Sequence, residues 1–207
     1  RRMREQQNAM LSGDWSIRVS TDLYRKTVGI IGMGRSGRAL VQRLKGFEPK
    51  LLAVTPHPNL AWGETQGVAF TDLATLLRES DYVSIHAPLT PQTRHLIGAA
   101  ELTAMKPGAI LINTARGGLV DDRALLEALR NGHLGGAGLD VYEGEADPEL
   151  KPVADALLAL PNVVGTPHSA ASTREGLART NMIIARTVVA VLDGAEAPEG
   201  CVIADGR

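Results

Sequence analysis

A glycine-rich turn constrains this chain more than any other feature of its sequence. Gly32, Gly34 and Gly37 follow the mostly apolar run 27–31, and a helical pattern that continues to Leu44 begins among them. A short apolar run of this kind is typical of a strand buried on both faces. A GxGxxG string is weak evidence alone, but it predicts a dinucleotide-binding turn when it joins a buried strand to a helix.

Each glycine of this turn has its own expected role. Gly32 allows the tight bend, Gly34 lets a pyrophosphate approach the backbone, and Gly37 lets the helix pack closely on the strand. The first N–H groups of the helix are then available to phosphate oxygens. Arg35 and Ser36, which lie between the glycines, are expected to contact the cofactor as well. A glycine turn without any ligand is the competing interpretation.

The residue at the end of the second predicted strand bears on which dinucleotide binds. An acidic side chain about 20 positions after the turn would bind the ribose 2′-hydroxyl of NAD and repel the 2′-phosphate of NADP. Thr55 occupies this place, so the repulsion is absent. No arginine replaces it, and His57 is a weaker candidate for a phosphate contact. We therefore expect NAD as the cofactor and leave NADP open.

The rest of the chain alternates apolar runs with helical patterns. This alternation predicts right-handed crossovers and an α/β doubly wound parallel sheet, the Rossmann fold, with six to seven strands. We also expect a helix over residues 1–11, a connector in which Trp15 packs, a loop-like segment over 143–152, and a long helix from about Ser172 to Leu192. The strand candidates are 27–31, 51–54, 82–85, 109–112, 136–141 and 163–164, with helices between them capped by Thr71 or Asp72 and by Asp121 or Asp122.

The composition narrows the classes of function. The net charge is −1, from 22 Lys and Arg against 23 Asp and Glu, and only 3% of the residues are aromatic. Neither a basic field nor a base-stacking platform is expected, so we expect no nucleic-acid partner. No apolar stretch approaches the ~20 residues of a membrane span, and the first residues lack the apolar run of a signal peptide. A single cysteine, Cys201, excludes an internal disulfide and a cysteine-rich metal site, so we expect a cytoplasmic protein without a metal centre.

Three titratable residues follow predicted strands. Arg116 lies in the glycine-containing stretch 113–118, Glu145 follows the strand that ends near residue 141, and His168 follows the strand at 163–164. The carboxyl ends of the strands in an open parallel sheet form its ligand crevice. We therefore expect the three side chains to meet at one edge of the sheet.

With these blocks, and with the stretch His86-Ala87-Pro88-Leu89-Thr90, the sequence resembles the D-isomer-specific 2-hydroxyacid dehydrogenase family over about residues 1–195. The spacing from Arg116 to Glu145 (145 − 116 = 29) is the one that the family uses, and it selects Glu145 rather than Glu143. The resemblance implies an oxidoreductase that transfers a hydride between a nicotinamide cofactor and a small D-2-hydroxy acid or 2-keto acid.

The resemblance also implies a role for each site residue. Arg116 would hold the substrate's carboxylate and carbonyl oxygen with its planar fork. His168 would exchange a proton with the substrate oxygen, and Glu145 would hydrogen-bond the imidazole and favour its protonated form. Asp140 would contact the nicotinamide carboxamide. The other residues implied to line the cofactor are Thr55, Pro88, Thr93 and Thr114. We interpret His86 as structural or cofactor-lining, and His95 and His133 as surface residues.

The chain departs from the family in its extent. Residues 1–20 resemble only the connecting helix and linker, 21–171 the dinucleotide-binding domain, and 172–207 the C-terminal helix and the return segment of a substrate domain. The family pattern places roughly one hundred more residues before the nucleotide domain. We therefore expect a truncated chain, with a naturally short protein as the alternative. Without that lobe we expect cofactor binding with weak or no turnover.

Two further expectations concern partners and class. The resemblance implies a homodimer with the N-terminal helix and neighbouring helices at the interface. Alternatively, Met3, Met10 and Leu11 of the N-terminal helix cover the protein's own core. The alternative function is an NAD(H)-sensing, corepressor-like binding protein, because such proteins share the fold and the triad. The identity of the 2-hydroxy acid is not specified by the sequence.

Overall fold

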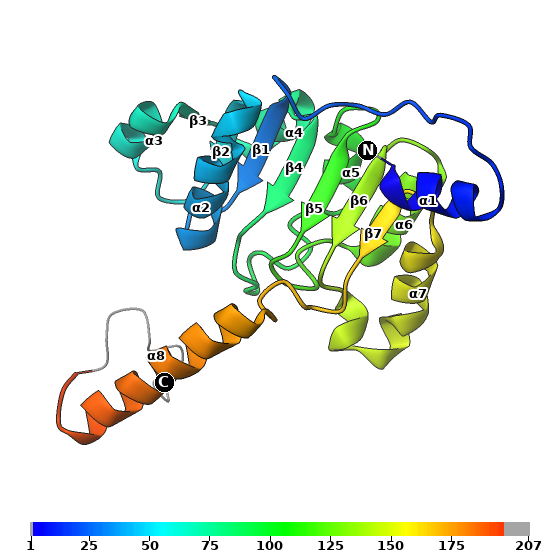
Figure 1. Ribbon diagram of the computed structural model, residues 1–207. Helices are drawn as coiled ribbons and strands as arrows, with labels where there is room; N and C mark the ends of the chain where they lie inside the picture. Colours follow the sequence, from blue (N-terminus) through cyan, green and yellow to red (C-terminus); the bar gives the residue numbers. More distant parts are fainter. Residues whose placement is uncertain (1, 197–207) are drawn as a thin grey trace. The chain divides into compact units, whose positions relative to one another are not determined.

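In the computed structural model of the chain, residues 2–196 are described (Figure 1). They divide into two compact units, one ending at Pro167 and the other beginning at His168. Residues 197–207, which include Cys201 and the end of the expected return segment, lie outside the described residues. The assignment of 1–20, 21–171 and 172–207 to separate parts of the protein stays a prediction.

The first unit is built on one parallel sheet of seven strands in the order β3-β2-β1-β4-β5-β6-β7. The order runs outward from β1 in both directions, which is the doubly wound arrangement and confirms the predicted α/β fold. The strands are β1 (Thr27–Ile31), β2 (Lys50–Val54), β3 (Val68–Phe70), β4 (Tyr82–Ile85), β5 (Ile110–Asn113), β6 (Gly136–Leu139) and β7 (Val163–Gly165).

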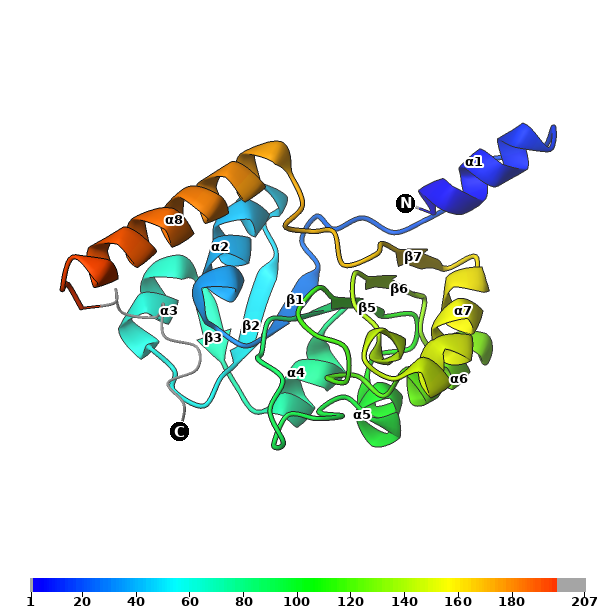
Figure 2. The same ribbon diagram turned by 90° about the horizontal axis from the view of Figure 1, so that it is seen from below.

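Helices cover the sheet on both faces (Figure 2). Helices α2 and α3 lie on one face, where Val41 and Leu44 pack with Val28 and Ile30 of β1. Helices α4 to α7 lie on the other face, over the larger apolar cluster that includes Leu111. The helices of this unit are α1 (Met3–Leu11), α2 (Arg35–Leu44), α3 (Leu60–Gln66), α4 (Leu73–Glu79), α5 (Ala99–Ala104), α6 (Asp122–Arg130) and α7 (Lys151–Ala159), with short 3-10 helices η1 (Lys45–Phe47), η2 (Glu143–Glu145) and η3 (Pro148–Leu150).

The second unit contains the long helix α8 (Arg174–Leu192), which the sequence predicted at about 172–192. The side chain of Thr173 caps it by accepting a hydrogen bond from the N–H of Gly176. None of its residues is buried, and apolar side chains such as Ile183 and Leu192 are exposed.

The last residues of six strands are paired in one row across the sheet. Ile31 of β1 pairs with Val54 of β2 and with Ile85 of β4, and the row continues from β4 to β5, β6 and β7 through Asn113, Leu139 and Gly165. Because the strands are parallel, the segment after each of these residues leaves the sheet at the same edge. This register brings the candidate site segments of the first unit to one edge.

Several short elements were not predicted. They are strand β3 and helices α3, α5 and α7, which have nine residues or fewer each. The expectation of a loop over 143–152 is wrong, because η2, η3 and the start of α7 occupy it. Trp15 was expected to pack but is 76% exposed in the described chain, so that prediction is also wrong.

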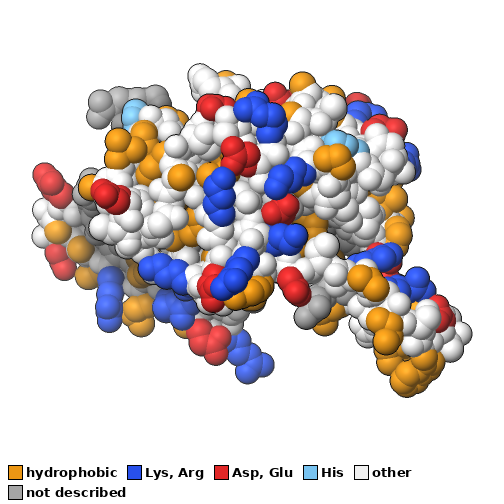
Figure 3. Space-filling model, turned by 90° about the horizontal axis from the view of Figure 1, so that it is seen from above, with side chains coloured by type: hydrophobic (Ala, Val, Ile, Leu, Met, Phe, Trp, Pro, Cys, Tyr) orange, Lys and Arg blue, Asp and Glu red, His pale blue; other side chains and the backbone are white. Residues whose placement is uncertain are grey.

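Two observations describe the surface. On the face drawn in Figure 3, basic and acidic side chains are intermixed, with no field of a single sign. Between residues 2 and 196, no helix combines the length and the apolar composition that a membrane crossing needs.

The first testable prediction concerns the packing of α2 on the turn before it. A Cβ atom added at Gly37 would lie 2.3 Å from the backbone oxygen of Gly32, which cannot move without opening the turn. Gly37→Ala should therefore lower the free energy of unfolding by about 1–3 kcal/mol, as overpacking does. Urea unfolding followed by circular dichroism measures the change. Gly46→Ala is the matched control, because no atom lies within 4 Å of its added Cβ. Equal stability of the two variants would contradict the close approach.

Candidate functional site

The glycine turn bends sharply between β1 and α2. Gly32 has a φ of +96°, a conformation that favours glycine. A Cβ on Gly32 would lie 2.7 Å from the backbone of His86. The N–H of Gly32 donates to the carbonyl oxygen of Val54 at 2.9 Å. The turn is therefore enclosed by the ends of β4 and β2, as close backbone packing requires.

The start of α2 is open toward the side on which a ligand would approach. Gly34 is the N-cap residue and has no side chain to cap the helix, so the first N–H groups keep their hydrogen-bonding capacity. Gly34, Arg35 and Ser36 are exposed, and an added Cβ at Gly34 would meet nothing within 4 Å. These features fit a bound pyrophosphate, which needs free backbone donors and space close to the backbone.

Other predicted cofactor residues follow neighbouring strands. Thr55 comes directly after β2 and is half-buried, while Thr114 follows β5 and is exposed. In the loop after β4, the Thr93 hydroxyl donates to the carbonyl oxygen of Pro88 at 2.7 Å and accepts from the N–H of Thr90 at 2.8 Å. The Thr93 side chain thus closes this loop. These two hydrogen bonds fix the conformation of the loop, and with it the positions from which Pro88 and Thr93 would contact a cofactor.

His86 is held between two serines at the end of β4. Its Nδ1 lies 2.8 Å from the Ser36 hydroxyl and its Nε2 lies 3.0 Å from the Ser84 hydroxyl. Burial lowers the pKa of His86, because desolvation penalises the imidazolium. The ring is therefore neutral at neutral pH and carries a single N–H.

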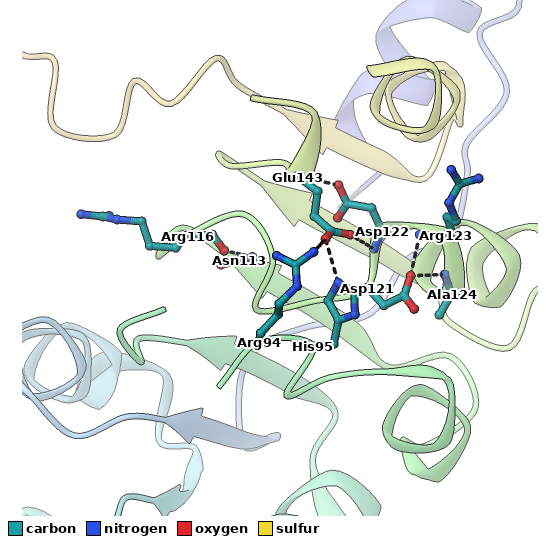
Figure 4. A network of polar contacts seen from close by, with 9 residues as sticks. All are labelled: Arg94, His95, Asn113, Arg116, Asp121, Asp122, Arg123, Ala124 and Glu143. Carbon is teal, nitrogen blue, oxygen red and sulfur yellow. Dashed lines mark hydrogen bonds and ion pairs between the residues drawn. The ribbon is translucent and has the colours of Figure 1, made fainter. Parts of the chain in front are cut away.

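The loop that carries Arg116 is shaped by a buried amide. Asn113, the last residue of β5, accepts a hydrogen bond from the N–H of Ala115 and donates one from Nδ2 to the carbonyl oxygen of Arg116. The Arg116 side chain is exposed, and it points away from the polar cluster drawn in Figure 4. A Cβ added at Gly117 would lie 2.1 Å from the carbonyl oxygen of Tyr142, so this loop contacts the segment that leads to Glu145.

Glu145 and Asp140 are placed by local hydrogen bonds after β6. Glu145 ends η2, and its carboxylate accepts from the N–H of Tyr142 at 2.6 Å. Asp140 is only 3% exposed, and its carboxylate accepts from the Thr166 hydroxyl. The Tyr142 hydroxyl donates to the carbonyl oxygen of Leu139. This segment therefore has a defined conformation and is not the irregular loop that the sequence suggested.

A buried carboxylate cluster holds η2 against α6 (Figure 4). The carboxylate of Glu143 accepts from the N–H of Asp122, and that of Asp122 accepts from the N–H of Glu143, at 3.1 and 2.9 Å. The other oxygen of Glu143 lies 2.7 Å from His95 Nε2 and 3.3 Å from the Arg94 guanidinium. The sequence analysis rejected Glu143 as the catalytic glutamate, because it lies two residues before the position that the family spacing from Arg116 requires. In the structure it fixes the turn in which Glu145 sits.

His168 begins the second unit, three residues after the last residue of β7. It is exposed and has a φ of +50°, a backbone conformation that is uncommon for a residue other than glycine. Residues in this region concentrate at functional sites, where the surrounding structure holds the strain.

The structure thus brings most of the predicted site residues to one edge of the first unit. The glycine turn, Thr55, Pro88, Arg116 and Asp140 all follow the row of paired strand ends. The sequence analysis did not identify the residues that hold the Glu145 turn through contacts between distant parts of the chain. These are above all Glu143, Asp122 and His95. Within residues 2–196, no group of three or more His, Cys, Asp or Glu side chains is arranged to hold a metal ion.

Comparison with known proteins gives one family. The sequence profile described as "D-isomer specific 2-hydroxyacid dehydrogenase, NAD binding domain" matches residues 1–170. The chain is 40% identical to the D-3-phosphoglycerate dehydrogenase of Methanocaldococcus jannaschii, over 88% of this chain and 34% of that protein. It is also 40% identical to the glyoxylate reductase of Korarchaeum cryptofilum, over 94% of this chain and 59% of that protein.

Solved structures agree with the sequence comparisons. The crystal structure of D-lactate dehydrogenase with NAD+ from Lactobacillus jensenii superposes with a TM-score of 0.87 and 34% identity, over 96% of this chain and 63% of that one. The chain spans about a third to three fifths of the length of the curated relatives it matches.

The carboxylate cluster generates a pH prediction. Burial, together with the nearby charges of Glu143 and Asp121, raises the pKa of Asp122 from 3.8 to about 6. The folded chain therefore holds this proton more tightly than the unfolded chain. The resulting stabilisation is complete below the unfolded value and is lost as the pH rises through about 6. Asp122→Asn removes the titration, so its stability relative to the unmodified chain should rise by at most about 3 kcal/mol between pH 4 and pH 7.

Chemical unfolding at a series of pH values measures this change. Asp72→Asn is the control with the opposite sign, because hydrogen bonds from the N–H and hydroxyl of Thr75 lower the pKa of Asp72. Its stabilisation is present at neutral pH and is lost on acidification. If the Asp122 variant kept a constant difference from the unmodified chain at every pH, the raised pKa would be wrong.

Proposed function

The chain belongs to the D-isomer-specific 2-hydroxyacid dehydrogenase family, and we propose that the protein carrying it transfers a hydride between a nicotinamide cofactor and a small D-2-hydroxy acid or its 2-keto acid. One observation carries the proposal. An open glycine turn and the Arg116 loop follow strands whose last residues pair in one row, so both leave the sheet at one edge. The named relatives act on different acids of this class, and the exact substrate is not assigned.

NAD is the proposed cofactor. The uncapped first turn of α2 and the open space at Gly34 support pyrophosphate binding by Gly32, Gly34, Arg35, Ser36 and Gly37. Thr55, at the end of β2, faces the ribose in this proposal, and Pro88, Thr93, Thr114 and Asp140 line the rest of the cofactor. Thr55 neither repels a 2′-phosphate nor attracts one, so preference for NAD over NADP is expected to be modest.

The proposed mechanism assigns one task to each catalytic residue. Arg116 binds the substrate carboxylate and carbonyl oxygen through paired N–H donors, which neutralises the carboxylate and orients the reacting carbon. His168 donates a proton to the carbonyl oxygen during reduction and removes it during oxidation. Glu145 accepts a hydrogen bond from that imidazole and favours its protonated form. When bound, the nicotinamide supplies or accepts the hydride.

The test is steady-state oxidation of NADH by the protein that carries this chain, with glyoxylate, hydroxypyruvate or pyruvate as substrate. Arg116→Ala should lower kcat/KM by about 100- to 1,000-fold, because two charge-assisted hydrogen bonds to the substrate are lost. NADH affinity, measured by fluorescence titration in parallel with NADPH, should stay within about twofold, because the proposal has Arg116 bind only the substrate.

Arg123→Ala is the matched control, since Arg123 is an exposed arginine at the start of α6, outside the proposed site. It should leave kcat/KM unchanged. Full turnover by the Arg116 variant would refute the assignment. Dinucleotide binding without turnover of any 2-keto acid would favour the sensing protein considered as the alternative.

We also propose that the protein forms a homodimer through its N-terminal segment, which consists of helix α1 and the connector between α1 and β1. Within the first unit, helix α1 is tied to the segments around α7 and β7 by Arg4, whose guanidinium donates to the carbonyl oxygens of Leu158 and Val163. Hydrophobic side chains gather over this segment (Figure 3), and Trp15, Ile17 and Val19 are 76%, 90% and 84% exposed. Adjacent exposed apolar side chains of this kind mark interaction surfaces. The cytoplasmic location expected from the sequence stays a prediction.

Replacing Ile17 and Val19 by glutamate should convert the dimer to a monomer, because each protomer would then bring two charges into the buried interface. Sedimentation velocity measures the mass. Leu60→Glu, at a 68% exposed leucine on α3, is the control and should leave the dimer intact. A monomeric unmodified chain would exclude this interface.

A further inference from the structure

The Ser36, His86 and Ser84 side chains form a hydrogen-bonded row from the interior of the sheet to the exposed start of α2. Ser84 and His86 are two residues apart at the end of β4, so both side chains lie on the face that α2 covers. Ser84 is 6% exposed, the ring of His86 is partly buried, and Ser36 is exposed as the second residue of α2. The row thus ends beside the open glycine turn.

The buried end of the row determines the direction of its hydrogen bonds. Within residues 2–196, His86 Nε2 is the single hydrogen-bond partner of the Ser84 hydroxyl. If Nε2 carried the ring proton, the hydroxyl proton of Ser84 would have no acceptor in a buried position, which is costly. The Ser84 hydroxyl therefore donates to Nε2, and the ring proton resides on Nδ1.

The exposed end follows from this assignment. Nδ1–H donates to the Ser36 oxygen at 2.8 Å, so that oxygen acts as an acceptor toward the protein. The proton of the Ser36 hydroxyl then remains for an acceptor on the open side of the turn. A phosphate oxygen at the first turn of α2 is an acceptor of the required kind.

We propose that Ser84 and His86 are positioning residues that orient the Ser36 hydroxyl as a hydrogen-bond donor to the diphosphate of the bound dinucleotide. The inference rests on the proposed function for the identity of the ligand, but the direction of the row is a property of the chain alone. Neither Ser84 nor His86 needs to touch the cofactor. Both act through the tautomer of one imidazole.

The first experiment reads the tautomer directly. Two-bond 1H–15N correlation spectra of the unliganded chain, with His86→Asn used to assign the signal, should show His86 protonated on Nδ1 and unprotonated on Nε2. Ser84→Ala removes the donor that selects this form and should shift the signal toward the other tautomer. Ser80→Ala is the matched control, because Ser80 is fully buried and its hydroxyl has no hydrogen-bond partner among the described residues. It should leave the His86 signal unchanged.

The second experiment measures NADH affinity by fluorescence titration. Ser36→Ala should weaken binding about tenfold, as expected for a lost hydrogen bond to a charged acceptor. His86→Asn keeps an N–H donor near the position of Nδ1 and should bind within about twofold of the unmodified chain. His86→Gln extends its amide toward Ser84 and should weaken binding several-fold. That loss should disappear when Ser36 is already alanine, because the two residues then act through one interaction.

The outcomes separate this inference from the proposed function. A ring protonated on Nε2, or a His86→Gln penalty that persists without the Ser36 hydroxyl, overturns the row while NADH binding stands. An unmodified chain that binds no NADH overturns the proposed cofactor and, with it, the ligand assigned to Ser36. The Nδ1 tautomer together with a vanishing penalty in the double variant supports the proposal.

Discussion

The site depends on the parallel pairing of strands whose last residues lie in one row. Backbone hydrogen bonds hold Ile31 beside both Val54 and Ile85, and the same register continues across the sheet to Gly165. A shift of one residue in any strand would move its following loop and turn its side chains to the other face. The glycine turn, the Arg116 loop and Asp140 share an edge because this register is kept.

Backbone proximity at that edge is possible only because two positions have no side chain. The Gly37 Cα approaches the oxygen of Gly32, and Gly117 approaches the carbonyl oxygen of Tyr142. The first contact lets α2 begin immediately after β1, with its N–H groups facing the open side. The second joins the Arg116 loop to the segment that carries Glu145. Both contacts are backbone to backbone, so they are insensitive to side-chain rotamers.

Polar side chains then hold the loops through hydrogen bonds. Asn113 shapes the Arg116 loop, and the reciprocal bonds between Asp122 and Glu143 fasten η2 to α6. Placing two carboxylates in a buried cluster opposes folding, as the raised pKa of Asp122 shows. Four partners offset this cost: two backbone N–H groups, the His95 ring and the Arg94 guanidinium. The cluster thereby gives the turn that contains Glu145 a defined conformation.

Local signals in the sequence determined the parallel fold, the glycine turn and which residues follow the longer strands. They also narrowed two helix caps to pairs of neighbouring residues, from which the structure selects Asp72 and Asp121. These signals are readable because hydrophobic period, glycine and capping chemistry act within a few residues. Short elements such as β3 carry too few residues for a period, and only packing in the sheet decides them. The tertiary structure alone decided that His95 meets Glu143, 48 positions away, and that Ser36 meets His86, 50 positions away. Such contacts depend on strand order and register, and these are set by the burial of the whole sheet rather than by any segment of it.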